Sequence, residues 1–142
     1  MDLSSKKVVI CDDDEALLES LTFFVEAWGV QVVPCSDGAE GAKKILSEKP
    51  DLIISDINMP NMTGLELLET LNKVQLQVPL IFLTGNNDLD SYRKSLVLGS
   101  FEFLTKPVDV EKLKSAVDKA LLFGKMDYPK GGFKDKLKKA VG

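Results

Sequence analysis

Five polar side chains stand where apolar runs of this sequence end, and their types are suited to act together. Three are carboxylates, one is a hydroxyl and one is an ammonium: Asp12, Asp13, Asp56, Thr84 and Lys106. A carboxylate at the end of a buried strand is costly unless its charge is used there. Three carboxylates in one pocket repel one another, so a proton or a cation must neutralise them.

A hard divalent cation would suit these oxygen ligands, and Mg²⁺ fits because it keeps waters and open positions for a phosphoryl group. Lys106 would supply positive charge on the other side of the pocket, and Thr84 would supply a hydrogen-bond donor. Charges positioned in this way favour phosphoryl transfer, in which catalysis is largely positioning and electrostatic stabilisation. The pocket offers no His, Ser or Cys, so a carboxylate oxygen is the expected nucleophile.

The chain contains no histidine, which removes Ser–His and Cys–His catalysis and most zinc sites from consideration. Any metal must then be held by oxygen, which points to magnesium, manganese or calcium. The two cysteines, Cys11 and Cys35, lie in apolar, strand-like contexts. We interpret them as core thiols rather than as a disulfide or metal ligands.

Apolar runs and helical spacings alternate along the chain. Strands are predicted at 7–11, 30–33 (ended by Pro34), 51–55, 78–83 and 101–104. Helices are predicted between them and after the last, with capping boxes at Asp37/Glu40 and Thr63/Glu66 and an N-cap at Asp109. This alternation predicts a parallel sheet covered on both faces, with all strand ends on one edge. Ligands bind at that edge in open α/β sheets.

Length and charge divide the chain into two parts. The 142 residues, 44% of them apolar, favour one domain with a packed core. Residues 1–124 hold 12 Lys and Arg against 20 Asp and Glu, a net charge of −8, whereas residues 125–142 hold six Lys and two Asp, a net charge of +4. We therefore expect a domain at 1–124 and a basic tail or linker at 125–142. In the tail, Phe133, Leu137 and Val141 share one face of a short helix, if one forms.

No apolar run approaches the ~20 residues of a membrane span, and the N-terminus lacks the apolar core of a secretory signal. A cytoplasmic protein is the expectation. The tail lysines are interpreted as solvated surface, with contact to nucleic acid or membrane as the alternative.

Four motifs, each at a predicted strand end, resemble the receiver domain of two-component response regulators. They are Val-Ile-Cys-Asp-Asp-Asp at 9–14, Asp-Ile-Asn-Met-Pro at 56–60, Leu-Thr-Gly at 83–85 and Phe-Leu-Thr-Lys-Pro at 103–107. The resemblance covers about residues 6–124, and its strength lies in all four motifs occurring in order. It implies a flavodoxin-like (βα)5 doubly wound parallel sheet of strand order 2-1-3-4-5.

The resemblance also implies roles for individual residues. Asp56 would be the phospho-acceptor, and Asp12 and Asp13 would hold Mg²⁺ (or Mn²⁺) together with Asp56 and the backbone carbonyl of Asn58. Lys106 would pair with phosphoryl oxygens. The switch residues would be Thr84, which bonds the phosphate, and Phe103, which rotates inward. The Lys106–Pro107 peptide bond would be cis.

Two features depart from the commoner pattern of such domains. Phe103 replaces a tyrosine, so the ring carries no hydroxyl to a partner and its signal would be purely apolar. Asn58 and Asn86 flank the pocket at positions that tune phosphate lifetime, and both are neutral here.

The leading hypothesis is a phosphorylation-controlled switch, a slow enzyme only in its own phosphorylation and dephosphorylation. A sensor histidine kinase or a histidine phosphotransfer protein would supply the phosphoryl group, and the fourth helix, fifth strand and fifth helix would face the output partner. Leu89, Tyr92 and Leu96 are interpreted as core or surface filler, or as part of that face. The switch would be a monomer or a phosphorylation-dependent homodimer that does not itself bind nucleic acid or membrane.

Two forms of this hypothesis stay open, a stand-alone regulator similar to single-domain chemotaxis regulators and the receiver part of a longer transcriptional or enzymatic regulator. A phosphatase of the haloacid dehalogenase type is the alternative from another class. Such an enzyme places a second Asp two residues after its nucleophile, and Asn58 occupies that position. A regulator of DNA or of a partner through the tail is the third, although eighteen residues cannot form a DNA-binding domain.

Overall fold

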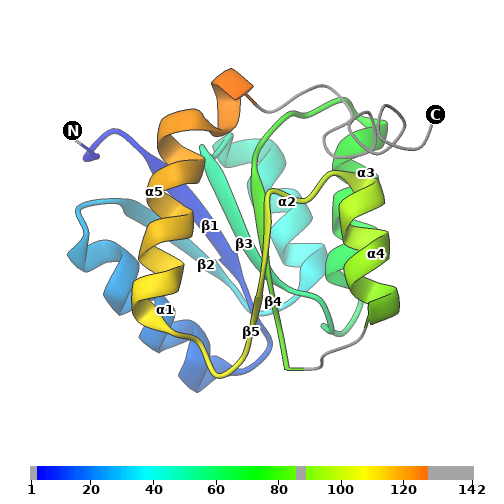
Figure 1. Cartoon of the computed structure of the whole chain (residues 1–142), viewed down its shortest axis with the longest axis horizontal. Helices are drawn as coiled ribbons and strands as arrows, with labels where there is room; N and C mark the ends of the chain where they lie inside the picture. Colours follow the sequence, from blue (N-terminus) through cyan, green and yellow to red (C-terminus); the bar gives the residue numbers. More distant parts are fainter. Residues whose placement is uncertain (1–2, 86–88, 128–142) are drawn as a thin grey trace.

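Strands and helices alternate throughout the part of the chain that the computed structural model describes, residues 3–85 and 89–127 (Figure 1). The strands are β1 (Lys7–Cys11), β2 (Gln31–Cys35), β3 (Leu52–Asp56), β4 (Leu80–Thr84) and β5 (Glu102–Thr105). The helices are α1 (Glu15–Ala27), α2 (Gly38–Glu48), α3 (Gly64–Lys73), α4 (Leu89–Leu98) and α5 (Val110–Asp127). Each of the five predicted strands is present within two residues of its expected bounds.

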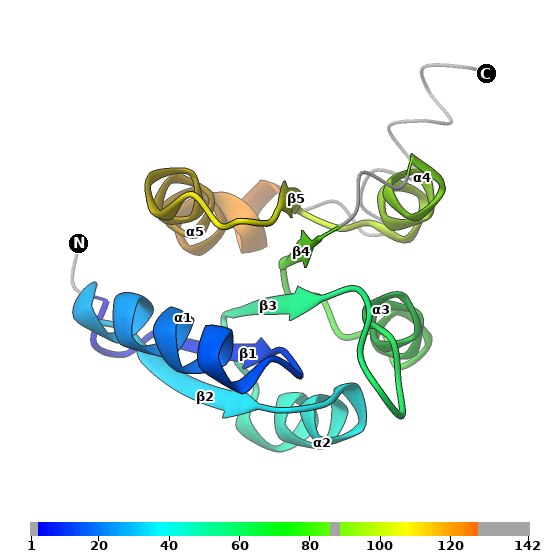
Figure 2. The same ribbon diagram turned by 90° about the horizontal axis from the view of Figure 1, so that it is seen from below.

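All strand pairs are parallel, and the order in the sheet is β2-β1-β3-β4-β5, as predicted. Figure 2 shows α1 and α5 on one face of the sheet and α2, α3 and α4 on the other. The register pairs Cys11 with Ser55, Asp56 with Leu83 and Thr84 with Thr105. The last residues of the strands therefore share one edge, and the polar residues that follow them are neighbours.

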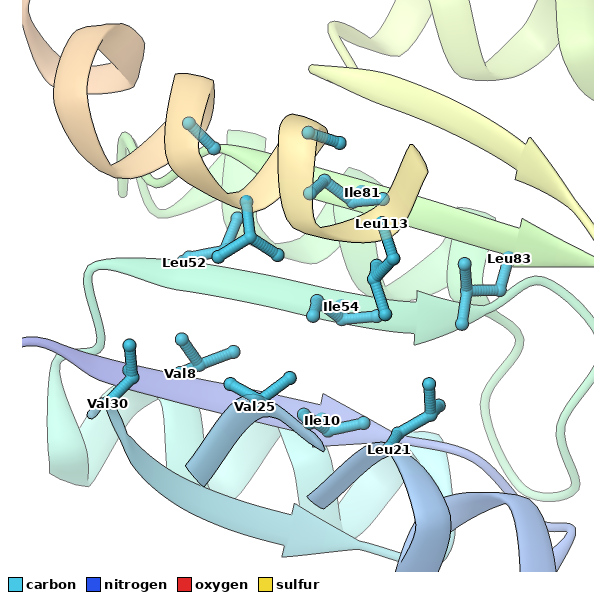
Figure 3. Close-up of a cluster of buried hydrophobic side chains, with 13 residues drawn as sticks. Val8, Ile10, Leu21, Val25, Val30, Leu52, Ile54, Ile81, Leu83 and Leu113 are labelled. Atoms are coloured by element: carbon cyan, nitrogen blue, oxygen red, sulfur yellow. The ribbon is translucent and has the colours of Figure 1, made fainter. Parts of the chain in front are cut away.

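Alternate residues of the central strands pack into two separate hydrophobic cores, one on each face of the sheet, because successive side chains point to opposite faces of a strand. Val8 and Ile10 of β1 pack with Leu21 and Val25 of α1 and with Leu113 of α5 (Figure 3). Val9 instead packs against the α2 and α3 side, together with Ile45, Leu67 and Phe82. Burial on both faces explains why β3 and β4 are continuous apolar runs. The free thiols of Cys11 and Cys35 are buried core residues, as expected.

Side chains at the predicted positions cap three helices. Asp109 Oδ1 accepts the N–H groups of Glu111 and Lys112, and the capping box between Thr63 and Glu66 is complete. The predicted box at Asp37 is only half formed. Asp37 accepts the Glu40 N–H at 2.7 Å, but the Glu40 carboxylate turns one residue further back and accepts the N–H and hydroxyl of Ser36.

Pro34 does not end β2, contrary to the sequence prediction. The strand continues through Pro34 to Cys35, and Pro34 pairs with Ile10 of β1. The topology explains the difference, because β2 is an edge strand and, among the described residues, no strand lies on its outer side to accept an N–H. Proline is tolerated in edge strands for this reason.

The last helix continues to Asp127, three residues into the segment predicted as tail. Near its end Gly124 is buried, and a Cβ there would lie 2.7 Å from Pro79 Cγ, so only glycine lets α5 pack this closely. The rest of the predicted tail, 128–142, lies outside the described residues. Within the described ranges, no helix has both the length and the apolar character that crossing a membrane requires.

Candidate functional site

Asp12 is placed by the end of β1. Its backbone N–H donates to the Cys35 carbonyl at 3.0 Å, which extends the pairing of β1 with β2 by one residue. Its carboxylate is fully buried, and Oδ1 accepts the N–H of Asp14, the N-cap residue of α1, at 2.9 Å. The turn from strand into helix therefore fixes this carboxylate at the edge of the sheet.

Asp56 is the last residue of β3 and is only 7% exposed. Its Oδ1 accepts the N–H of Asn58 at 3.2 Å. The following segment turns back sharply, and Gly64 at the start of α3 donates its N–H to the Ile57 carbonyl at 2.8 Å. A Cβ on Gly64 would overlap the Asp56 carbonyl oxygen, so glycine is required for this close approach.

Lys106 brings a positive charge between the two buried carboxylates. Its Nζ lies 3.1 Å from Asp12 Oδ2 and 3.0 Å from Asp56 Oδ2. It follows β5, its N–H bonds the Thr84 carbonyl at 2.6 Å, and the Lys106–Pro107 peptide bond is cis. One ammonium thus bridges groups that are 94 and 50 residues away along the chain.

The pKa values of the pocket reflect burial opposed by charge. Burial raises the pKa of Asp12, although the Asp14 N–H and the Lys106 ammonium act in the opposite direction. Burial alone would lower the pKa of Lys106, but the hydrogen bond to Asp56 and the charges of Asp12 and Asp56 outweigh it and raise that pKa. Lys106 is therefore a fixed cation at neutral pH, and it leaves part of the negative charge of the pocket uncompensated.

Asp13 completes the acidic group. Asp12, Asp13 and Asp56 each present one carboxylate oxygen, and the three oxygens lie within 4.8 Å of one another. Asp13 is exposed while the other two are buried, so the group opens to solvent on one side. An all-carboxylate donor set with access to water fits a hard divalent cation such as Mg²⁺.

Thr84 and Phe103 lie on the neighbouring strands β4 and β5. Thr84 ends β4 and is 1% exposed. Phe103 is half-buried in β5, pairs in register with Phe82 and packs its ring against Tyr92 of α4, with centroids 5.1 Å apart and a tilt of 38°. Asn58 is exposed at the mouth of the pocket, and Asn86 lies outside the described residues.

Comparison with known families identifies the chain. The model of the response regulator receiver domain matches residues 8–118. The chain belongs to this family. The predicted family and the flavodoxin-like fold are thereby confirmed, and the receiver domain superposes on a solved receiver domain from Clostridium thermocellum with a TM-score of 0.80 and 30% identity, covering 85% of this chain and 98% of that one.

Two relatives place this receiver among larger proteins. It is 40% identical over 114 residues to the transcriptional regulatory protein GlrR of Escherichia coli. The aligned residues cover 80% of this chain and 26% of that protein. It is 34% identical over 118 residues to the alkaline phosphatase synthesis transcriptional regulatory protein PhoP of Bacillus subtilis, with 83% and 49% covered. The receiver thus spans a quarter to a half of the length of these relatives.

Most of the predicted site residues of the receiver meet at one edge of the sheet, but two contributions were not predicted. One is the N–H of Asp14, which holds the Asp12 carboxylate. The other is Tyr92, whose ring contacts Phe103. From the sequence, Tyr92 is interpreted as core or surface filler or as part of the output face, but a contact between α4 and β5 depends on how the helix crosses the sheet, which the sequence pattern does not specify.

Proposed function

We propose that this receiver domain is a phosphorylation-controlled switch in which Asp56 accepts a phosphoryl group. The observation that carries the proposal is the position of Asp56, which is a buried carboxylate held by the Lys106 ammonium and adjacent to two further carboxylates. Such a concentration of negative charge at a strand end opposes folding unless a bound cation uses it. The family match supports phosphoryl acceptance as the general task of the domain.

The chemistry asked of Asp56 is a nucleophilic displacement. A carboxylate oxygen of Asp56 attacks the phosphorus of a phosphohistidine on a sensor histidine kinase or a phosphotransfer protein. The P–N bond breaks, its electron pair stays on the imidazole nitrogen, and an aspartyl phosphate forms. The hydrogen bond from the Asn58 N–H orients the carboxylate during the attack, because that N–H fixes Oδ1.

Mg²⁺ or Mn²⁺, held by Asp12, Asp13, Asp56 and the Asn58 carbonyl, would neutralise charge on the transferring group. Lys106 supplies the other positive charge. Its Nζ already lies 3.0 Å from Asp56 Oδ2, so a phosphoryl group on Asp56 brings new oxygens within reach of the same ammonium. Burial of Asp12 keeps this charge arrangement in a medium less polar than water, where it is stronger.

Phosphorylation would then shift a two-state equilibrium at Thr84 and Phe103. The Thr84 hydroxyl would bond the phosphoryl group, and Phe103 would exchange its contact with Tyr92 for a deeper position. Because Tyr92 belongs to α4 and Phe103 to β5, this exchange changes the surface formed by α4, β5 and α5. We propose that this surface meets the output partner.

The names of the two relatives favour regulation of transcription as the output. In that form the chain would act as the receiver part of a regulator, and a stand-alone switch that docks on a partner is the second form. The haloacid-dehalogenase-type phosphatase gains no support, because the family match is to receivers and Asn58 occupies the position of the second acid.

The proposal is tested by incubating the full chain with acetyl phosphate and Mg²⁺ and following phosphorylation by intact mass. We expect the parent chain to gain one phosphoryl group and Asp56→Asn to gain none. Asp118→Asn is the matched control, since Asp118 forms an exposed ion pair with Lys114 on α5 and should leave phosphorylation unchanged. An undiminished label on Asp56→Asn would remove Asp56 from the acceptor role.

A further inference from the structure

A groove with both acidic and apolar walls runs beside α1. Its volume is about 450 Å³, and its lining includes three glutamates and three apolar residues: Glu15, Glu19, Glu26, Leu18, Phe23 and Pro34. Phe23 is 70% exposed, so its ring adds little to the core. Exposed apolar surface bordered by polar residues is typical of an interaction site.

The negative charge of this groove is uncompensated. Glu15, Glu19 and Glu26 are all exposed, and in the described part of the chain none of them forms an ion pair. The preferred occupant is therefore a segment that combines apolar side chains with several positive charges.

The sequence that follows α5 has this combination. Residues 128–142 hold five lysines and one aspartate, a net charge of +4. Phe133, Leu137 and Val141 recur at every fourth position among the lysines. This spacing is that of an amphipathic helix that lays an apolar face into a groove.

The connection between α5 and this segment is long enough to return to the Trp28 end of α1. α5 and α1 cover the same face of the sheet (Figure 2), and Lys114 of α5 lies over the ring of Trp28, the C-cap of α1, at 5.8 Å. Lys114 lies 13 residues before Asp127, which is ~20 Å of helix, and the six steps from Asp127 to Phe133 also span up to ~20 Å when extended. Attachment to the same chain gives the segment an effective concentration of order millimolar.

A second groove, between α3 and α4, does not suit the same occupant. It has a volume of about 390 Å³, and its lining includes Arg93 and Lys94 against a single acid, Glu69. The two cations would repel a lysine-rich segment. Charge complementarity therefore selects the groove beside α1.

We propose that residues 133–141 dock in the acidic groove beside α1, with Phe133, Leu137 and Val141 against Phe23 and its apolar neighbours and the lysines against the three glutamates. This intramolecular contact does not depend on phosphoryl transfer at Asp56.

Zero-length cross-linking of the full chain with a carbodiimide tests the proposal, because the reagent joins a lysine amine to a nearby carboxylate with loss of water. At low protein concentration, peptide mapping of the monomeric product should find tail lysines joined to Glu15, Glu19 or Glu26. Glu19→Lys with Glu26→Lys should lower the cross-links to Glu15, the groove carboxylate that remains, at least about fivefold, as expected when two ion pairs are lost and repulsion replaces them. Adding Lys134→Glu and Lys138→Glu to that variant should restore cross-linking between the same positions.

Glu69→Lys is the matched control, since it places the same change in the other groove and should leave the cross-links at α1 unaltered. Equal yields at Glu15 in the parent and in the Glu19→Lys/Glu26→Lys chain would overturn the proposal, provided circular dichroism shows both folded. So would cross-links spread evenly over the surface acids, or cross-links found only between molecules.

Discussion

Replacing Lys106 by methionine should destabilise the fold in a way that depends on pH. The change keeps a long apolar stem and removes the ammonium that lies 3.1 Å from Asp12 Oδ2 and 3.0 Å from Asp56 Oδ2. The Asp12 side chain is fully buried and that of Asp56 is 10% exposed, so neither carboxylate can recover the lost interaction from bulk water. Breaking a buried pair by removing one partner costs about 3–5 kcal/mol. Because the Lys106 side chain is 22% exposed, we expect the lower end, about 3 kcal/mol at pH 7.

The sign of the pH dependence follows from Asp12. Burial already raises its pKa in the folded parent, and loss of the Lys106 charge would raise it further. A carboxyl whose folded pKa lies above its unfolded value destabilises the fold at high pH, and that destabilisation is relieved as pH falls through the folded pKa. The loss in free energy of unfolding caused by Lys106→Met should therefore become smaller as the solution is acidified below pH 7.

Urea unfolding followed by fluorescence of Trp28, the single tryptophan of the chain, provides the assay. Lys94→Met is the control, since Lys94 makes an exposed 3.4 Å pair with Asp90 in α4 and should cost only about 0.3–0.5 kcal/mol. If Lys106→Met cost no more than Lys94→Met, or if its deficit did not change with pH, the argument that Lys106 balances buried charge would be wrong.

Three further outcomes follow from the site. Gly64→Ala should lower the free energy of unfolding by about 2 kcal/mol, because the new Cβ would overlap the Asp56 carbonyl oxygen and lie 2.8 Å from Phe82 Cε1. Urea titration measures this loss, and an unchanged unfolding midpoint would contradict the close approach of Gly64 to Asp56. Mg²⁺ at 100 times its Kd should raise the free energy of unfolding of the parent chain by about 2.7 kcal/mol, and Asp13→Asn should lose most of this gain. Equal gains in the two chains would place the cation away from Asp13. Asp12→Asn should stabilise the metal-free chain, since it removes one of three crowded charges, and a lower melting temperature in the presence of a chelator would refute that reasoning.

Much of the fold was predictable because local and global signals agree. The apolar runs of β3 and β4 are buried on both faces, which left little ambiguity about their type, although β4 begins two residues after its predicted start. The Thr63 capping box predicted the start of α3 because its two partners, Thr63 and Glu66, lie only three residues apart in the sequence. The proximity of the acids at the ends of β1 and β3 was predicted from the topology of parallel sheets, in which all strand ends share one edge, and not from the residues next to them in the sequence.

The errors arose where tertiary position overrides local preference. Pro34 ends a strand in most contexts, but here it lies on an edge that needs no N–H donor. The Glu40 carboxylate has hydrogen-bond donors of two preceding residues within reach, and Ser36 offers both an N–H and a hydroxyl where Asp37 would offer one N–H. The contact between Tyr92 and Phe103 depends on where α4 crosses the sheet, and helical periodicity carries no information about that crossing.

The acceptor role of Asp56 is tested most directly by locating the phosphoryl group in the parent chain. The full chain is phosphorylated with acetyl phosphate and Mg²⁺, reduced with borohydride, which converts an aspartyl phosphate to homoserine, and mapped by peptide mass spectrometry. We predict homoserine at position 56 and at no other aspartate, with none formed when a chelator replaces Mg²⁺. Conversion at another aspartate while Asp56 stays intact would contradict the proposed function.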